Sequence, residues 1–247
     1  LKLARAATGR FKTLSFWDSF HGAGFGAIGV GGEALFRSGP IGPLMPGDAH
    51  VPPFSCYRCP YGYADLDGEP DLDACNIRCA EMVRYVLEKE GDVAAEPVRS
   101  APYLPPPGFW PAVRRACDDH GALLIFDDIP SGLGKTGKMF SCQHFHVIPD
   151  IITLGKALGG GMLPIAAVIA RAHLDVLGER ALGHYTHEKN PVTARAALTT
   201  LEIIESEGLT ENAARVGAQA LDRLREMKTR HPLIGDVRGL GLLIAPF

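Results

Sequence analysis

The sequence lacks any long hydrophobic run and any excess of positive charge. Although 46% of its 247 residues are hydrophobic, no run reaches the roughly 20 apolar residues that a membrane-spanning helix needs. Lysine and arginine number 25 and aspartate and glutamate 28, which gives a formal net charge of −3. The basic excess typical of nucleic-acid-binding domains is therefore absent. We expect a soluble α/β enzyme domain with neither a membrane nor a nucleic-acid partner.

A secretion signal and a disulfide framework are also missing. The opening residues, Leu1 to Arg5, contain too short an apolar region for a signal peptide. Six cysteines in a chain of 247 residues argue for free thiols, because disulfide frameworks belong mainly to small secreted domains. The cytoplasm is therefore the expected location.

Four of the cysteines form two closely spaced pairs. Cys56 and Cys59 make a C-x2-C pattern, and Cys75 and Cys79 make a C-x3-C pattern, which a zinc or iron–sulfur site can also show. The second pair opens an expected helix over residues 74–90, where positions i and i+4 share one face. Two buried thiols would give the same spacing, so we expect no metal.

Two apolar runs that end in charged residues stand out in the second half of the chain. Residues 122–126 are an unbroken apolar run that ends at Asp127-Asp128, and residues 151–154 end at Gly155-Lys156. Such runs are typical of buried parallel strands. Ligands of open α/β sheets bind at the carboxyl ends of the strands, so we expect Asp127 and Lys156 to project into one crevice. Pyridoxal phosphate chemistry needs this pair: a lysine forms a Schiff base with the cofactor, and a carboxylate keeps the pyridine nitrogen protonated.

Other interpretations of these residues are simpler. A lone lysine before glycines is commonly a solvated loop residue, and an aspartate after a strand commonly caps a helix. Gly134-Lys135-Thr136 suggests a phosphate loop, but Ile129 stands where that pattern needs a glycine. The glycines between 22 and 32 give only a weak dinucleotide signal, because no amphipathic helix can follow in a segment so rich in glycine and proline.

The segments 126–137 and 153–161 resemble those of the class-III pyridoxal phosphate-dependent aminotransferases. The family has Asp-Glu-Val-Gln-Thr-Gly-Phe-Gly-Arg-Thr-Gly in the first segment and Thr-Leu-Gly-Lys-Ala-Leu-Gly-Gly-Gly in the second, and the resemblance runs along nearly the whole chain. It implies the large domain of fold-type I transferases, a mostly parallel sheet flanked by helices, over residues 1–191. Residues 192–247 would form connecting helices and only the start of a smaller C-terminal domain.

The same resemblance assigns roles to individual residues and implies pyridoxal 5′-phosphate as the cofactor. Lys156 and Asp127 would be catalytic, and the aromatic residue of an aromatic-His-Gly motif would stack on the pyridine ring. A threonine would reach the phosphate of the neighbouring subunit, which implies a homodimer with shared active sites. The further cofactor-binding residues are Phe20, His21, Gly22, Glu96, Ile129 and Thr186.

The chain departs from the family pattern in several places. Pro130 replaces the glutamine that would donate a hydrogen bond to the cofactor's phenolic oxygen, and proline has no donor. The family's phosphate-binding turn ahead of the first helix is absent, as is the arginine that many members use for a substrate carboxylate. We expect a partial chain.

The resemblance implies an aminotransferase that moves an amino group from a small amine or amino acid to a keto acid through a Schiff base on Lys156. Two alternatives stay open. A subgroup with the Ile129-Pro130 variant and the stretch 184–189 looks like ammonia-lyases that act on hydroxy-aminoethylphosphonate. The other alternative is an inactive remnant of such an enzyme. The substrate itself cannot be derived from the sequence.

Local patterns predict the remaining elements. Glycine ends a first helix at Gly9, and a proline-rich segment over 23–60 excludes long helices. Apolar residues at i, i+3 and i+4 predict amphipathic helices near the C-terminal end. The expected elements are a strand over 11–17, a strand from Val93 to Glu96, and helices over 108–120, 191–208 and 209–230.

Overall fold

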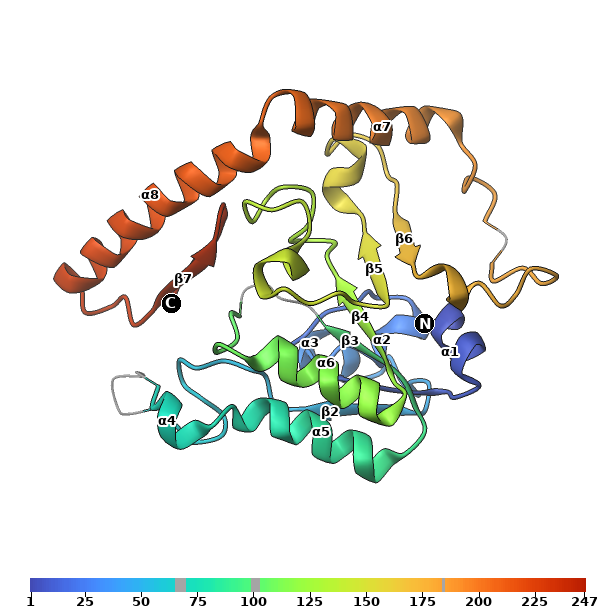
Figure 1. The fold of residues 1–247 in the computed structure, drawn as a ribbon, viewed down its shortest axis with the longest axis horizontal. Helices are drawn as coiled ribbons and strands as arrows, with labels where there is room; N and C mark the ends of the chain where they lie inside the picture. The colour runs from blue at the N-terminus through green and yellow to red at the C-terminus, as the bar shows by residue number, and fades with distance from the viewer. Residues whose placement is uncertain (65–69, 99–102, 184) are drawn as a thin grey trace.

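The computed structural model describes residues 1–64, 70–98, 103–183 and 185–247, without the side chains of residues 96–98. A 6-stranded sheet runs through the molecule (Figure 1). Its order is β2-β1-β3-β4-β5-β6, and every neighbouring pair is parallel except β5 and β6. This confirms the expected fold-type I architecture. The strands are β1 (Lys12–Phe16), β2 (Asp48–Val51), β3 (Val93–Val98), β4 (Leu123–Asp127), β5 (Ile151–Leu154) and β6 (Ala167–Ala170).

Two helices, α5 (Arg78–Glu90) and α6 (Phe109–His120), lie side by side along one face of the sheet (Figure 1). They cover the main hydrophobic core, whose largest fully buried side chain is Trp110. Its ring centroid lies 4.9 Å from that of Phe126 on β4. Burying such aromatic area is the dominant stabilising term of this layer.

The opposite face has a thinner cover, made by α1 (Lys2–Thr8) and the 3₁₀ turn η3 (Ala172–Leu174). Ala4 of α1 packs against Ile125 and Ile151 of the central strands. The helix ends as predicted, because Gly9 has a φ of +68° and its N–H bonds to the carbonyl of Arg5. Among the described residues, no helix is both long and apolar enough to cross a membrane.

The expected continuous helix over 74–90 is wrong. A single turn, α4 (Leu72–Cys75), ends at Asn76, and α5 starts afresh at Arg78. Asn76 and Ile77 have φ of +42° and +55°, and two successive left-handed residues break the helical hydrogen-bond ladder. Cys75 and Cys79 therefore do not share one face of a helix.

The glycine- and proline-rich segment over 23–60 contains no long helix, as predicted. It forms two single turns, α2 (Phe25–Ile28) and α3 (Ala34–Arg37), and then the edge strand β2. The sequence did not predict β2. Its four residues alternate between polar and apolar, but the run is short and follows a segment rich in glycine and proline, and it forms by parallel pairing with β1.

The predicted C-terminal helices are α7 (Pro191–Ser206) and α8 (Leu209–Arg230), which run along the edge of the molecule in Figure 1. Asn190 caps α7 through its side chain, and Pro191 occupies the first turn. A hairpin of β7 (Val237–Leu240) and β8 (Leu243–Pro246) follows. The division into domains at residue 191 stays a prediction.

The hairpin is anchored to the body of the molecule at its turn. The N–H of Leu242 bonds to the carbonyl of Lys135 at 2.9 Å. Gly241 has a φ of +54°, and a Cβ there would lie 2.4 Å from the carbonyl carbon of Thr136. Only glycine fits this close backbone approach.

Candidate active site

Asp127, the last residue of β4, has a carboxylate held by three donors. His21 Nδ1 lies 2.8 Å from Oδ2, Thr153 Oγ1 lies 3.2 Å from Oδ1, and the Ile129 N–H lies 3.4 Å from the same Oδ1. The side chains of His21 and Asp127 are only 6% and 9% exposed. An ionised carboxylate can only accept, so His21 donates from Nδ1. The three bonds fix both the position and the orientation of the carboxylate.

Asp128, the next residue, has a structural task. Its carboxylate accepts hydrogen bonds from the Ser131 hydroxyl at 2.8 Å and from the Ser141 N–H at 2.9 Å, as well as from the Ser141 hydroxyl. These bonds close the loop that follows β4. Asp127 is therefore the acid that faces a cavity, and Asp128 is the acid that shapes the loop.

A cavity of about 690 Å³ lies beside Asp127. Its volume falls within the roughly 300 to 1,000 Å³ typical of small-molecule sites. Asp127 and Thr153 contribute polar groups to its wall, and apolar side chains from β4, β5 and β6 supply much of the rest. Ile129 also lines it, and its Cγ2 lies 3.5 Å from where a Cβ on Gly155 would stand. Ile129 and the carboxylate of Asp127 thus line the same cavity, and the cofactor-binding role of Ile129 stays a prediction.

Lys156 is separated from the end of β5 by Gly155 and begins the 3₁₀ helix η2 (Lys156–Gly159). Its φ is +46°, uncommon for a residue other than glycine and a form of strain that gathers at functional sites. The residue is exposed, and within the described part of the chain its amine makes no hydrogen bond or ion pair. β4 and β5 are neighbours with Asp127 opposite Thr153, three positions before Lys156. Lys156 does not line the cavity that Asp127 faces.

The side chains of Phe20 and His21, in the aromatic-His-Gly segment, lie in two different places. His21 lines the cavity, while the ring of Phe20 lies 4.5 Å from that of Phe36 at an angle of 49°. Gly22 has a φ of +122°, a conformation that favours glycine. The expected stacking role of Phe20 stays a prediction.

The two remaining predicted residues are Glu96 and Thr186. The backbone of Glu96 pairs with Leu124 in the sheet, but the Glu96 side chain lies outside the described residues. Thr186 is exposed and lines a separate cavity of about 530 Å³ together with His187 and Glu188. Tyr185 lines both cavities, so the two adjoin.

The role of Thr153 was not predicted from the sequence, although the residue belongs to the second motif. Its position opposite Asp127 follows from the parallel register of β4 and β5. Because the pairing register cannot be read from either strand alone, the contact becomes visible only in the assembled sheet.

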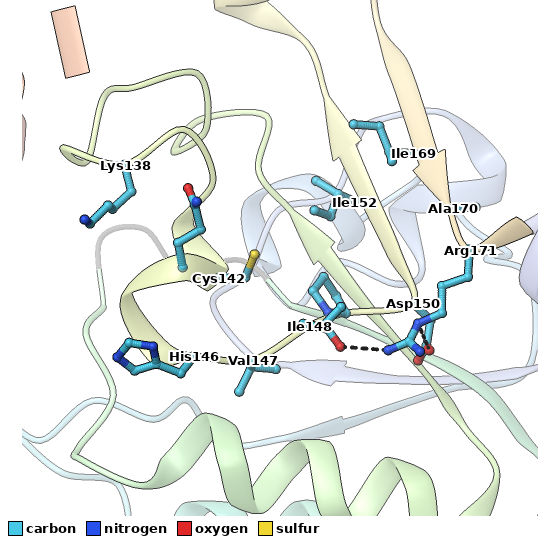
Figure 2. A pocket seen from close by; sticks show the side chains of 12 residues that line it. Lys138, Cys142, His146, Val147, Ile148, Asp150, Ile152, Ile169, Ala170 and Arg171 are labelled. Carbon is cyan, nitrogen blue, oxygen red and sulfur yellow. Dashed lines mark hydrogen bonds and ion pairs between the residues drawn. The ribbon is translucent and has the colours of Figure 1, made fainter. Parts of the chain in front are cut away.

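Another cavity, of about 710 Å³, lies on the opposite face of the same sheet edge (Figure 2). Ile152 and Ile169 line it, whereas their neighbours Thr153 and Val168 line the cavity of Asp127, as alternation along a strand requires. Of the two cations that line it, Lys138 and Arg171, Arg171 is already paired, with Nε 3.1 Å from Asp150 Oδ1 and Nη2 donating to the Ile148 carbonyl. None of the predicted site residues lines this cavity of about 710 Å³.

All six cysteines are free thiols. Burial is the main cause that raises the pKa of Cys56 to about 11 and that of Cys79 to about 12. Across the described ranges, no three histidine, cysteine or acidic side chains are grouped so as to hold a metal ion. The expectation that Cys56, Cys59, Cys75 and Cys79 bind no metal stays a prediction.

The residues present fit pyridoxal phosphate at two of its groups. Three donors occupy part of the Asp127 carboxylate and leave it able to accept one more hydrogen bond, which a protonated ring nitrogen would donate. His21 Nε2 is buried and has no partner among the described residues. The amine of Lys156 has no partner in the described ranges and has the chemistry to bond an aldehyde, although Lys156 does not line the cavity of Asp127.

Comparisons with known proteins agree with this chemistry. The family described as "Aminotransferase class-III" matches residues 1–246. An (R)-1-hydroxy-2-aminoethylphosphonate ammonia-lyase from Vibrio splendidus is 44% identical over 254 aligned positions, 98% of this chain and 53% of that protein. A leucine/methionine racemase from Thermococcus litoralis is 41% identical, over 99% of this chain and 55% of that protein. The chain thus spans about half the length of the curated relatives it matches.

A solved structure shows the same fold with the cofactor in place. It is an amine transaminase from an uncultivated Pseudomonas species in a PLP-bound form, with a TM-score of 0.89 and 30% identity over 98% of this chain and 58% of that one. The family match and this structure indicate pyridoxal 5′-phosphate as the cofactor. The chain belongs to the class-III aminotransferase family.

Proposed function

We propose that this chain is part of an aminotransferase that moves an amino group from a small amine or amino acid to a keto acid. One observation carries the proposal: Asp127, held by three donors, faces a cavity at the end of β4, and Lys156 lies two residues after the end of the neighbouring strand β5. A carboxylate held in place and an amine without a partner among the described residues, both just after adjacent strands, are what pyridoxal phosphate chemistry requires.

Each residue has a defined task in this proposal. The bound cofactor would supply an electron-withdrawing ring. Asp127 would accept a hydrogen bond from the ring nitrogen and keep that nitrogen protonated. Lys156 Nζ would hold the cofactor through its aldehyde carbon, and, once the substrate amine has displaced it from that carbon, the freed amine would carry a proton to and from the substrate carbon. Ile129 covers part of the cavity wall with apolar surface, which excludes water there.

Ammonia elimination is a second candidate function. Its support is the 44% identity to the phosphonate ammonia-lyase, higher than the 30% identity to the amine transaminase. Glu188 and Lys189 are exposed charged residues beside Thr186, and a cation there suits an anionic substrate group such as a phosphonate. On this alternative the substrate is a hydroxy-aminoalkyl phosphonate or phosphate.

One assay separates the two candidates. A transaminase cannot turn over repeatedly without a keto-acid acceptor, whereas a lyase releases ammonia and needs none. We expect acceptor-dependent turnover with full-length protein on a panel of ω-amines, amino alcohols and aminophosphonates. Ammonia and aldehyde released over many turnovers without a keto acid would assign the chain to the lyases.

Covalent attachment of the cofactor tests Lys156 directly. Borohydride reduction followed by peptide mapping should place the label on Lys156, and Lys156→Ala should abolish it. Lys138→Ala is the matched control and should retain the label. Label found on Lys135 or Lys138 in the wild-type protein would contradict the assignment. No cofactor binding at all would favour the inactive remnant.

Asp127→Asn should keep the fold but lose most activity, because an amide cannot hold the ring-nitrogen proton. The expected loss is about 100- to 1,000-fold in kcat, as for other lost electrostatic contacts to a reacting group. Near-wild-type turnover would rule out this role for Asp127.

A homodimer completes the proposal. Thr186 is exposed and outside the cavity of Asp127, which suits a threonine that reaches the cofactor phosphate of a neighbouring subunit. Thr186→Val should then weaken cofactor binding without changing the attachment site on Lys156. A monomer in sedimentation analysis that still binds the cofactor would contradict the shared site.

A further inference from the structure

We infer that Thr153 is a positioning residue that determines which oxygen of Asp127 meets the cofactor. The inference rests on the proposed function, because it assumes that a pyridine nitrogen occupies the cavity beside Asp127. Thr153 acts through Asp127 and does not itself take part in the reaction.

The sheet holds Thr153 against Asp127. The two residues are partners in the parallel register of β4 and β5, and the Asp128 N–H bonds to the Thr153 carbonyl at 3.0 Å. Both side chains line the same cavity. A β-branched side chain has few χ1 choices in a strand, so the backbone pairing also directs the hydroxyl. Its Oγ1 donates to Asp127 Oδ1 at 3.2 Å.

The bond from Thr153 affects which acceptor position on the Asp127 carboxylate stays free for the cofactor. A carboxylate offers about four acceptor positions, two on each oxygen. Thr153 and the Ile129 N–H both donate to Oδ1, and His21 Nδ1 donates to Oδ2. Counting the donors in the described part of the chain, both positions on Oδ1 are used and one position remains, on Oδ2. The cofactor's ring nitrogen would meet Oδ2.

Without the Thr153 hydroxyl, the orientation of the Asp127 carboxylate is held less firmly, so it is less well determined which oxygen faces the cofactor. Among the described residues, the Ile129 N–H is the other donor to Oδ1, and its 3.4 Å separation makes it the longer contact. His21 alone cannot fix the rotation of the carboxylate, because a single bond to one oxygen leaves the other free to move. The Thr153 hydroxyl thus supplies the second fixed point.

The test compares Thr153→Val with Thr153→Ser. Valine keeps the shape and suits a strand but has no donor, whereas serine keeps the hydroxyl. Valine should weaken the binding of pyridoxal phosphate about tenfold or more, the effect of one hydrogen bond to a charged group. Serine should restore most of the affinity. Thr136→Val is the matched control, since Thr136 is also buried and bonded, to His144 at 3.1 Å, but does not contact Asp127.

A second readout separates positioning from a general loss of packing. The ring-nitrogen proton of ¹⁵N-labelled pyridoxal phosphate, followed by NMR over a pH series, should be lost at a lower pH in the valine variant than in the wild type. The serine and Thr136→Val variants should match the wild type. His21, Tyr185 and Lys2 are the other titratable side chains that line the cavity, and all variants leave them unchanged.

The outcomes distinguish the inference from the function on which it rests. If the wild-type protein does not bind the cofactor, the proposed function fails and the inference fails with it. If the wild type binds, but Thr153→Val matches it in affinity and in the ¹⁵N titration, the inference alone is overturned. Failure of serine to restore what valine loses would also overturn it. Should the valine variant not fold, Thr153→Ala replaces it, judged by the same comparison with serine.

Discussion

Replacing Gly217 by alanine should destabilise the protein, although alanine is the better helix former. Gly217 is a buried residue within α8, and a Cβ there would lie 2.0 Å from the carbonyl oxygen of Gly241 and 2.2 Å from its carbon. Helix propensity alone would favour alanine by about 1 kcal/mol. Overpacking costs about 1 to 3 kcal/mol, and the upper end applies because the obstructing atoms are backbone and cannot rotate away.

The net effect is a loss of about 2 kcal/mol, which corresponds to a fall in melting temperature of about 4 to 8 °C for a chain of this size. Thermal unfolding followed by circular dichroism measures it. Gly26→Ala in α2 is the matched control, since a Cβ at Gly26 would meet nothing within 4 Å. It should change stability by no more than about 1 kcal/mol. A Gly217→Ala protein as stable as the wild type would show that α8 does not approach the hairpin turn this closely.

Two further predictions follow from the pKa shifts. Burial is the main cause that lowers the pKa of His50 from 6.5, so the unfolded chain takes up a proton there more readily than the folded protein. The stability that neutral His50 contributes is present above pH 6.5 and is lost as the pH falls through the lowered pKa of the folded protein. The urea concentration at the midpoint of unfolding should therefore drop between about pH 7 and 5. The variant His50→Phe should show a smaller drop. Cys56 and Cys79, with a pKa of about 11 and about 12, should react slowly with iodoacetamide at neutral pH. Elemental analysis should find no stoichiometric metal, and one zinc or two irons per chain would contradict this.

The sequence predicted elements whose causes are local. Gly9 ends α1 because glycine takes the left-handed conformation, and the apolar run before Asp127 makes a central strand. What it missed depends on contacts between distant segments. β6 becomes a strand by pairing with β5, and Thr153 meets Asp127 only after the sheet has assembled.

One failure and one prediction that stays open have other physical causes. The break at Asn76 and Ile77 interrupts a segment with a helical pattern, and nothing in the spacing of its apolar residues marks two left-handed residues. The joint placement of Asp127 and Lys156 in one crevice was expected because both follow parallel strands, and it stays a prediction, since Lys156 does not line the cavity beside Asp127. The left-handed φ of Lys156 belongs to the turn that leaves the strand, and strand-end arguments do not specify the direction of such a turn.

The edge strand β6 has a consequence for handling the chain in solution. Val168 and Ile169, on opposite faces, are 61% and 46% exposed, and in the described part of the chain β6 pairs only with β5 (Figure 1). An uncovered edge with β-branched residues on both faces is a template for intermolecular strand addition. A net charge of −3 offers little repulsion against such contacts. The solubility of the isolated chain should therefore fall steeply with concentration, and a lysine in place of Ile169 should raise it.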